Sequence, residues 1–164
     1  MGVHDDLDAI AKELGDLSFA AGSVIATAES CTGGWVAKVL TDIPGSSTWF
    51  DRGFVTYTNE AKQEMLGVRA ETLATHGAVS EQTVSAMAQG AIERSRGTVA
   101  VAISGIAGPG GAMPEKPLGT VWFAWARQDG GVRCCCEHFD GGRDEVRHQA
   151  VAFALRGLID LEVL

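Results

Sequence analysis

The stretch Thr27-Ala28-Glu29-Ser30-Cys31-Thr32-Gly33-Gly34 decides how this chain folds, because an apolar run ends in front of it and a new pattern starts after it. Residues 24–26 are apolar and typical of the end of a buried strand. Residues 35–40 repeat apolar side chains at helical spacing. The small polar residues and two glycines in between therefore predict a tight turn from a strand into a helix.

Ser30 lies in this turn, next to the first amides of the predicted helix. The amides around Gly33, Gly34 and Trp35 have no intrahelical acceptor, and the helix dipole adds partial positive charge at the same place. A hydroxyl beside such donors can act as a nucleophile with its own oxyanion hole, as acyl transfer requires. A glycine-rich turn with an N-capping Ser or Thr is the structural alternative.

The rest of the sequence predicts helices that alternate with strands. The expected helices cover residues 5–21, 33–41, 59–66, 71–75, 80–95 and 143–161, and the expected strands cover residues 23–28, 49–57, 98–103, 119–127 and 132–139. Asn59 is the expected cap of the third helix, and Asp129-Gly130 is a hairpin signal. Gly53 indicates a bulge or a close backbone approach in the second strand.

This order of elements predicts an α/β fold, a three-layer α/β/α sandwich with a mixed sheet. We expect one domain over residues 1–164, with no additional N-terminal domain. A second glycine-rich loop, residues 104–111, also follows a buried strand. Ligands of such open sheets bind at the strand ends, where both glycine-rich loops should lie.

Composition limits the classes of function. The chain has 164 residues and a net charge of −8, which opposes broad binding to nucleic acid because that needs a basic face. No apolar run approaches the length of a membrane helix. The start of the chain lacks a basic region followed by an apolar run, so we expect no secretory signal and a cytoplasmic protein.

The four cysteines do not predict a disulfide framework or a metal site. Cys134, Cys135 and Cys136 are consecutive, so in a strand their side chains point to alternate faces and cannot converge on one ion. Cys31 is a rival nucleophile to Ser30, because a nearby helix terminus would lower the pKa of its thiol.

Four motifs in a fixed order make the sequence more specific than a generic strand-to-helix turn. They are AESCTGG (28–34), VTYTNEAK (55–62), GAVS (77–80) and GIAGPGG (105–111). Together they resemble the CinA C-terminal domain family, the nicotinamide-nucleotide amidohydrolases. The resemblance runs from the first helix to residues 143–147, nearly the whole chain.

The resemblance implies hydrolysis of the carboxamide of nicotinamide mononucleotide to nicotinate mononucleotide and ammonia, in pyridine-nucleotide salvage. It also implies a serine with a lysine, without metal or cofactor, and a homo-oligomer (a dimer or higher). Carried over, the nucleophile is Ser30, the lysine is Lys62 and a supporting hydroxyl is that of Tyr57. Ser104 stands where the family more often has threonine, and Asp51-Arg52 departs from its more usual small residue before Gly53.

Nine further residues are candidates for substrate binding: Thr32, Gly33, Gly34, Ser104, Gly108, Gly110, Gly111, Arg143 and Arg147. Arg143 and Arg147 are one helical turn apart and can hold a phosphate, or they are solvated or paired with acids. The closely spaced amides of residues 108–111 can form an anion nest, or the glycines simply permit a tight turn.

A serine attacks an amide only if its proton has an acceptor, and no histidine lies in either glycine-rich loop. Lys62 can accept the proton if desolvation or a neighbouring cation lowers its pKa. A solvated surface lysine is the structural alternative, and Tyr57 can equally be a residue at the edge of the core. Two other functions stay open: a non-catalytic nucleotide-binding module linked to competence or DNA damage, and a thiol or metal hydrolase of another small amide.

Overall fold

The computed structural model describes residues 6–163, so Asp5 of the first predicted helix lies outside the described residues. The elements are α1 (Leu7–Ala21), β1 (Ile25–Glu29), α2 (Trp35–Thr41), the 3-10 turn η1 (Ser46–Thr48), β2 (Phe50–Val55), α3 (Asn59–Leu66), α4 (Ala70–His76), α5 (Glu81–Glu93), β3 (Val99–Gly105), β4 (Thr120–Arg127), β5 (Val132–His138) and α6 (Arg143–Glu162). Each predicted helix and strand has a counterpart among them.

The strands form one sheet in the order β2-β1-β3-β4-β5. β1 pairs in parallel with both β2 and β3, while β4 is antiparallel to β3 and to β5. The predicted mixed sheet and the hairpin around Asp129-Gly130 are therefore confirmed. All five residues of β1 are buried, as expected for a strand that is covered on both faces.

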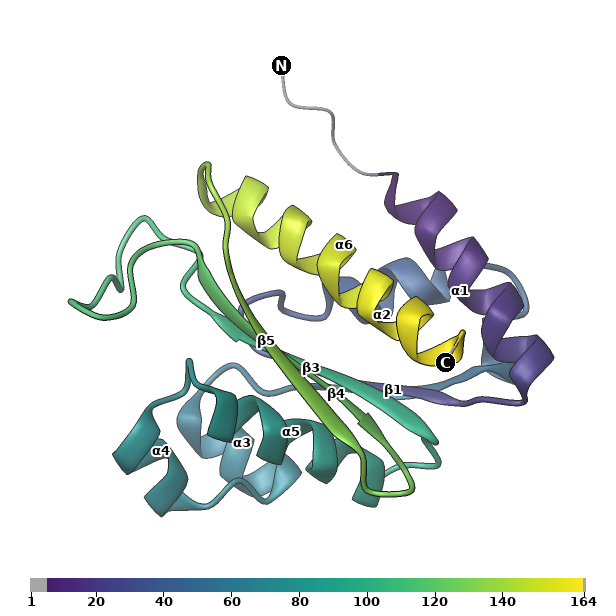
Figure 1. Ribbon diagram of the computed structural model, residues 1–164, viewed down its shortest axis with the longest axis horizontal. Helices are drawn as coiled ribbons and strands as arrows, with labels where there is room; N and C mark the ends of the chain where they lie inside the picture. Colours follow the sequence, from purple (N-terminus) through teal and green to yellow (C-terminus); the bar gives the residue numbers. More distant parts are fainter. Residues whose placement is uncertain (1–5, 164) are drawn as a thin grey trace.

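Helices cover both faces of the sheet, which confirms the predicted sandwich (Figure 1). On one face α1, α2 and α6 pack over a core that includes Leu14, Val36 and Leu155. On the other face α3, α4 and α5 enclose a second core with Leu66 and Met87. The cysteines of β5 follow the predicted alternation, because Cys135 packs against the first core and Cys134 against the second.

Two glycines allow the close packing that positions the site. A Cβ atom on Gly157 of α6 would lie 2.0 Å from Cε2 of Trp125 in β4, so only glycine lets α6 lie this close to the sheet. A Cβ atom on Gly53 of β2 would lie 2.5 Å from Oγ1 of Thr27. The close approach predicted at Gly53 is thus confirmed, and β2 is held against the strand that precedes Ser30.

Some predicted boundaries were wrong. Thr58, not Asn59, caps α3, because its extended backbone lets its hydroxyl accept the N–H of Ala61. β3 continues to Gly105, since the ladder to β4 extends to the pair Gly105 and Val121. Ser104 therefore lies in a strand and not in the second glycine-rich loop.

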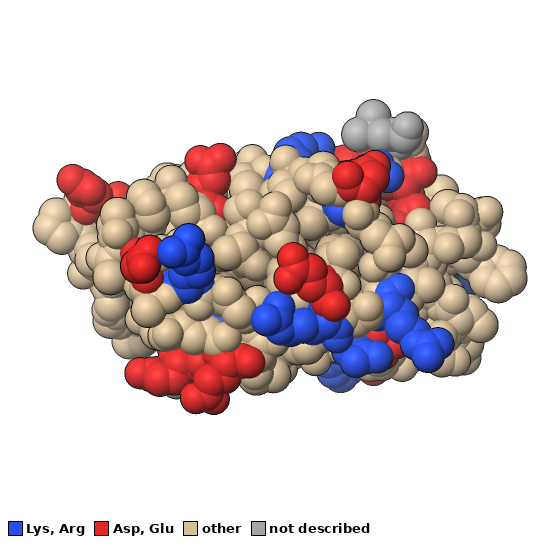
Figure 2. Space-filling view, turned by 90° about the horizontal axis from the view of Figure 1, so that it is seen from below, with Lys and Arg blue, Asp and Glu red and all other residues tan. Residues whose placement is uncertain are grey.

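The face covered by α3, α4 and α5 carries both kinds of charge. Acidic and basic side chains are interspersed there with uncharged surface between them (Figure 2). This face therefore presents no continuous basic surface. Over residues 6–163, none of the helices combines the length and the apolar character that a membrane crossing needs.

Candidate active site

A cavity of about 270 Å³ opens at the carboxyl ends of the parallel strands. Ser30 follows β1, Tyr57 follows β2 and Ser104 lies near the end of β3, while Lys62 enters from α3 and Arg143 from α6. These five predicted site residues all line the cavity. The topology therefore brings together side chains that are up to about a hundred residues apart in the sequence.

Ser30 and Lys62 are in direct contact at the bottom of this cavity. Nζ of Lys62 lies 3.0 Å from Oγ of Ser30, and the two residues are only 1% and 7% exposed, respectively. Burial lowers the pKa of Lys62 from 10.5 to about 8, because desolvation disfavours the charged ammonium. At pH 7 about a tenth of Lys62 is then the free amine, about 300-fold more than at its ordinary pKa.

The other contacts of Lys62 suit a neutral amine. Nζ donates to the carbonyl oxygen of Thr56 at 2.8 Å and to that of Tyr57 at 3.2 Å. A neutral amine has two N–H groups and one lone pair. In the neutral form, with both N–H groups on these carbonyls, the lone pair can accept the proton of Ser30. Among residues 6–163, the other acceptor near the Ser30 hydroxyl is the Tyr57 carbonyl, at 3.4 Å.

Cys31 also lines the cavity, but the pKa of its thiol is raised and not lowered as expected. Burial raises the pKa of Cys31 to about 11, and the negative charge of Glu29 acts in the same direction. The expectation of a lowered pKa at the helix terminus is therefore wrong, because desolvation outweighs the effect of the nearby backbone donors. At neutral pH the residue is a protonated thiol and a poor nucleophile.

The prediction that the N–H groups of Gly33 and Trp35 are free is also wrong. The N–H of Gly33 donates to Ser30 O, and that of Trp35 donates to Thr32 O, both at 3.0 Å. The N-terminus of α2 faces Glu29, whose buried carboxylate accepts its next two N–H groups. The start of the helix is thus closed to a substrate.

Among residues 6–163, three amides of the turn donate to no other residue, those of Cys31, Thr32 and Gly34. The N–H of Cys31 directly follows the serine, which is the position that nucleophilic turns between a strand and a helix use for the oxyanion. The oxyanion donor is therefore better sought at Cys31 than at Gly33 or Trp35.

Tyr57 contributes its backbone rather than its hydroxyl to the serine and the lysine. The residue is 59% exposed, and its hydroxyl accepts a hydrogen bond from Arg143 at 3.3 Å. Arg143 also donates to the carbonyl of Gly108 at 2.8 Å. Tyr57 and Arg143 therefore form the rim of the cavity, with the arginine held toward it.

Several predicted binding residues do not line the cavity: Thr32, Gly33, Gly34, Gly108, Gly110, Gly111 and Arg147. The hydroxyl of Thr32 donates to Glu29 inside the turn. The guanidinium of Arg147 donates to the backbone carbonyls of Cys31 and Thr32. Arg143 and Arg147 thus point to different partners although they are one helical turn apart.

The sequence reasoning gave no role to Ala78, Val79 and Ala107, which complete the apolar wall of the cavity. Ala78 and Val79 belong to the GAVS motif at residues 77–80. The motif was noticed, but these two apolar side chains carry no reactive group that would have suggested a role in the site. Apolar walls matter here because they exclude water from Lys62 and so lower its pKa.

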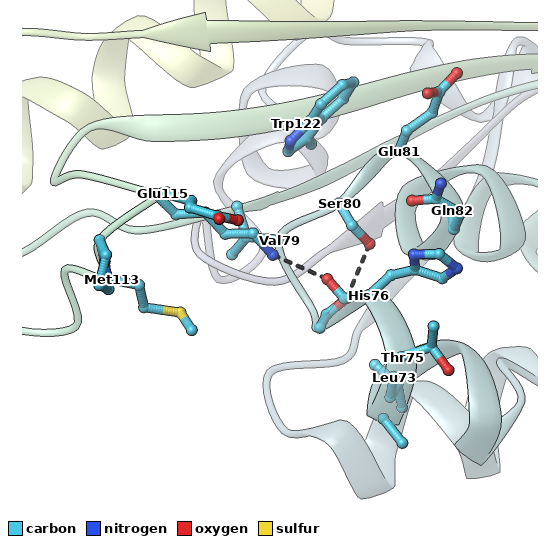
Figure 3. Close-up of a pocket in the computed structure, with 14 residues that line it drawn as sticks. Leu73, Thr75, His76, Val79, Ser80, Glu81, Gln82, Met113, Glu115 and Trp122 are labelled. Carbon is cyan, nitrogen blue, oxygen red and sulfur yellow. Dashed lines mark hydrogen bonds between the residues drawn. The ribbon is translucent and has the colours of Figure 1, made fainter.

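A larger cavity of about 740 Å³ lies next to the first and shares Val79 with it. Figure 3 shows His76 and Ser80 on one side, Met113 and Glu115 on the other and Trp122 over the top. None of the predicted site residues lines this cavity. Within residues 6–163, no group of three or more His, Cys, Asp or Glu side chains is arranged to hold a metal ion.

Comparison with known proteins identifies the family and similar folds. The model of the CinA C-terminal domain matches residues 7–161. The nicotinamide-nucleotide amidohydrolase PncC of Escherichia coli (strain K12) is 58% identical over 153 residues, which cover 93% of each chain. A CinA-like protein of Akkermansia muciniphila is 56% identical over 82% of this chain and 33% of its own length. The crystal structure of the competence/damage inducible protein CihA from Agrobacterium tumefaciens matches 98% of this chain and 99% of its own with a TM-score of 0.91, at 49% identity.

Proposed function

This chain belongs to the CinA C-terminal domain family, and we propose that it is an amidohydrolase that converts nicotinamide mononucleotide to nicotinate mononucleotide and ammonia. The observation that carries the proposal is the 3.0 Å contact between Ser30 and a buried lysine of lowered pKa. The names of relatives that are 58% identical, nicotinamide-nucleotide amidohydrolases, support the substrate. The reaction fits pyridine-nucleotide salvage in the cytoplasm, and the homo-oligomer stays a prediction.

In the proposed mechanism, Oγ of Ser30 attacks the carboxamide carbon while the neutral amine of Lys62 takes the hydroxyl proton. The N–H of Cys31 donates to the resulting oxyanion. The tetrahedral intermediate then collapses, the C–N bond breaks, and the Lys62 ammonium returns its proton to the leaving nitrogen, which departs as ammonia. A water molecule then attacks the acyl-enzyme ester while Lys62 takes its proton. The bond between the acyl carbon and Oγ breaks, Lys62 returns the proton to Oγ of Ser30, and the nicotinate product leaves and loses its carboxyl proton to solvent.

Arg143 is the residue that we propose for the phosphate of the substrate. It is the one arginine among the residues that line the cavity, and its two hydrogen bonds leave other N–H groups of the guanidinium available. Its place at the rim puts a positive charge at the open end of the cavity, away from Ser30 and Lys62. A nucleotide can then place its carboxamide inside and its phosphate outside.

Ammonia release tests this function directly. We expect the protein to release ammonia from nicotinamide mononucleotide faster than from nicotinamide riboside or nicotinamide, because the latter two lack the phosphate. Calorimetry on the same samples measures binding. Binding of the nucleotide without ammonia release would overturn the proposal in favour of a binding module, and loss of activity with a chelator would indicate a metal hydrolase.

The pH dependence of the reaction follows from Lys62. Because the base must be unprotonated and its pKa is about 8, kcat should rise about tenfold per pH unit below pH 8 and level off above it. Initial rates between pH 6 and 9.5, with the fold monitored by circular dichroism, measure this. A flat profile over the same interval would contradict the role of Lys62 as general base.

A further inference from the structure

Glu29 and Arg147, two residues of opposite charge, form hydrogen bonds with the backbone around the turn that carries Ser30. Glu29 bonds N–H groups after the turn, and Arg147 bonds carbonyl groups within it. We propose that Glu29 and Arg147 act together as positioning residues that hold Ser30 in its reactive geometry, and that Arg147 does not bind the phosphate. The chemistry that they serve rests on the function proposed above.

Glu29 is buried and its carboxylate links the turn to the first residues of α2 by hydrogen bonds. It is 1% exposed, and its carboxylate accepts the hydroxyl of Thr32 at 2.7 Å and the N–H groups of Val36 and Ala37 at 2.9 and 3.1 Å. No ion pair of Glu29 occurs among the described residues. A buried carboxyl group is tolerated only when such hydrogen bonds satisfy its oxygens, so the burial of Glu29 depends on this arrangement of the turn and α2.

Arg147 holds the turn from α6, more than a hundred residues away. Its Nε donates to the carbonyl of Cys31 at 2.9 Å, and its Nη2 lies 3.4 Å from that of Thr32. The guanidinium also lies over the ring of Trp35, 5.7 Å from its centroid. Because the planar guanidinium contacts two neighbouring carbonyl oxygens and an aromatic ring, its position is well defined. The ammonium group of a lysine could not make the same set of contacts.

These bonds act on the chemistry through the peptide planes. Because a peptide unit is planar, a carbonyl that is held in place also fixes the N–H on its other side. The bond from Gly33 to Ser30 O fixes the N–H of Cys31 in this way, and the bond from Arg147 to Cys31 O fixes the next N–H. The same contacts set the backbone on which the Ser30 hydroxyl meets Lys62.

We would test the pair with Glu29→Gln, Arg147→Met, Arg147→Lys and the double variant Glu29→Gln/Arg147→Met. Lys38→Met is the matched control, because Lys38 is an exposed residue of α2 that pairs with Asp42. The measurements are kcat and KM for nicotinamide mononucleotide, the rate at which a fluorophosphonate labels Ser30, seen by mass spectrometry, and the folded fraction from circular dichroism.

We expect each of the three single changes at Glu29 and Arg147 to lower kcat and the labelling rate by about 10²-fold per folded molecule, since misplacement of the reacting groups has effects of this size. KM should change by less than about threefold, because uniform binding of the substrate is retained. The double variant should be about as impaired as the poorer single variant, since residues that act as a unit are not additive. Arg143→Met should instead raise KM.

Several outcomes would overturn the inference. A raised KM with unchanged kcat in Arg147→Met would make Arg147 a phosphate ligand. Unchanged kcat and labelling rate per folded molecule would leave both residues with a purely structural role. If the loss of kcat in the double variant equalled the product of the two single losses, the two residues would act independently and not as a unit. If Glu29→Gln does not fold, the values of kcat, KM and labelling rate for the two Arg147 variants test the inference.

The labelling rate separates this inference from the proposed function. If the wild type released no ammonia but labelled Ser30 at a rate that depends on Glu29 and Arg147, only the function would fail. If the wild type hydrolysed the nucleotide and the variants matched it, only the inference would fail. A wild type with neither activity would refute both.

Discussion

Ser30→Ala should lower kcat for nicotinamide mononucleotide by about 10⁴- to 10⁶-fold, as loss of the nucleophile does in a hydrolase that uses a covalent intermediate. The methyl group fits the site without the oxygen that attacks the carboxamide, and within residues 6–163 the side-chain hydrogen bonds lost are those to Lys62 and to the Tyr57 carbonyl. The fold should therefore be retained. Ammonia release, together with circular dichroism and the melting temperature, measures both parts of this result.

Cys31→Ala is the matched control for the serine. It removes the neighbouring side chain in the same cavity and leaves the backbone N–H that we assign to the oxyanion. Because the pKa of this thiol is about 11, it is not the nucleophile at neutral pH, and the variant should keep most of its activity. The reverse outcome, an active Ser30→Ala and an inactive Cys31→Ala, would transfer the chemistry to the thiol.

Lys62→Met should lower kcat by about 10³- to 10⁴-fold, the upper range for general acid–base catalysis, because Lys62 both takes the serine proton and supplies the proton of the leaving ammonia. Methionine has a similar length and is compatible with burial. The remaining activity should also lose its rise between pH 6 and 8. Rates over this pH range, with the folded fraction checked at each pH, give both numbers.

Two further variants show whether the loss is specific. Lys62→Arg keeps a cation that does not deprotonate at these pH values, so it should be as inactive as the methionine variant. Lys12→Met changes a lysine on the surface of α1 and should leave kcat unchanged. A Lys62→Met protein with more than about a tenth of wild-type kcat would refute the role of Lys62, given the usual size of the effect.

Much of the fold was predictable because periodicity and turn chemistry are local properties. The first helix, the buried strand before Ser30 and the hairpin at Asp129-Gly130 each follow from a few neighbouring residues. The boundaries were less predictable where tertiary pairing decides them. Ser104 became part of β3 because β4 continues the ladder past it, which no local pattern reveals.

The sequence predicted part of the cavity: five of the twelve predicted site residues line it and seven do not, and the hydrogen-bond partners of the turn were not predictable. Motif order pointed to Ser30 and Lys62, which the fold brings to 3.0 Å. The sequence could not reveal that Glu29 closes the start of α2 or that Arg147 returns from α6 to the carbonyl of Cys31, because both depend on how distant elements pack. The thiol of Cys31 was misjudged for the same reason, since its burial depends on the whole fold.

The buried Lys62 makes the folded state less stable than the same fold with an apolar side chain there. Its pKa is about 8 when folded and 10.5 in the exposed state, so the folded protein binds fewer protons between these values, and the contribution of Lys62 to the free energy of unfolding rises with pH across that interval. Below pH 8 the buried ammonium costs on the order of 3 kcal/mol. An apolar side chain at this position would therefore give a more stable fold, and in the proposed mechanism Lys62 gives up this stability for a base of lowered pKa.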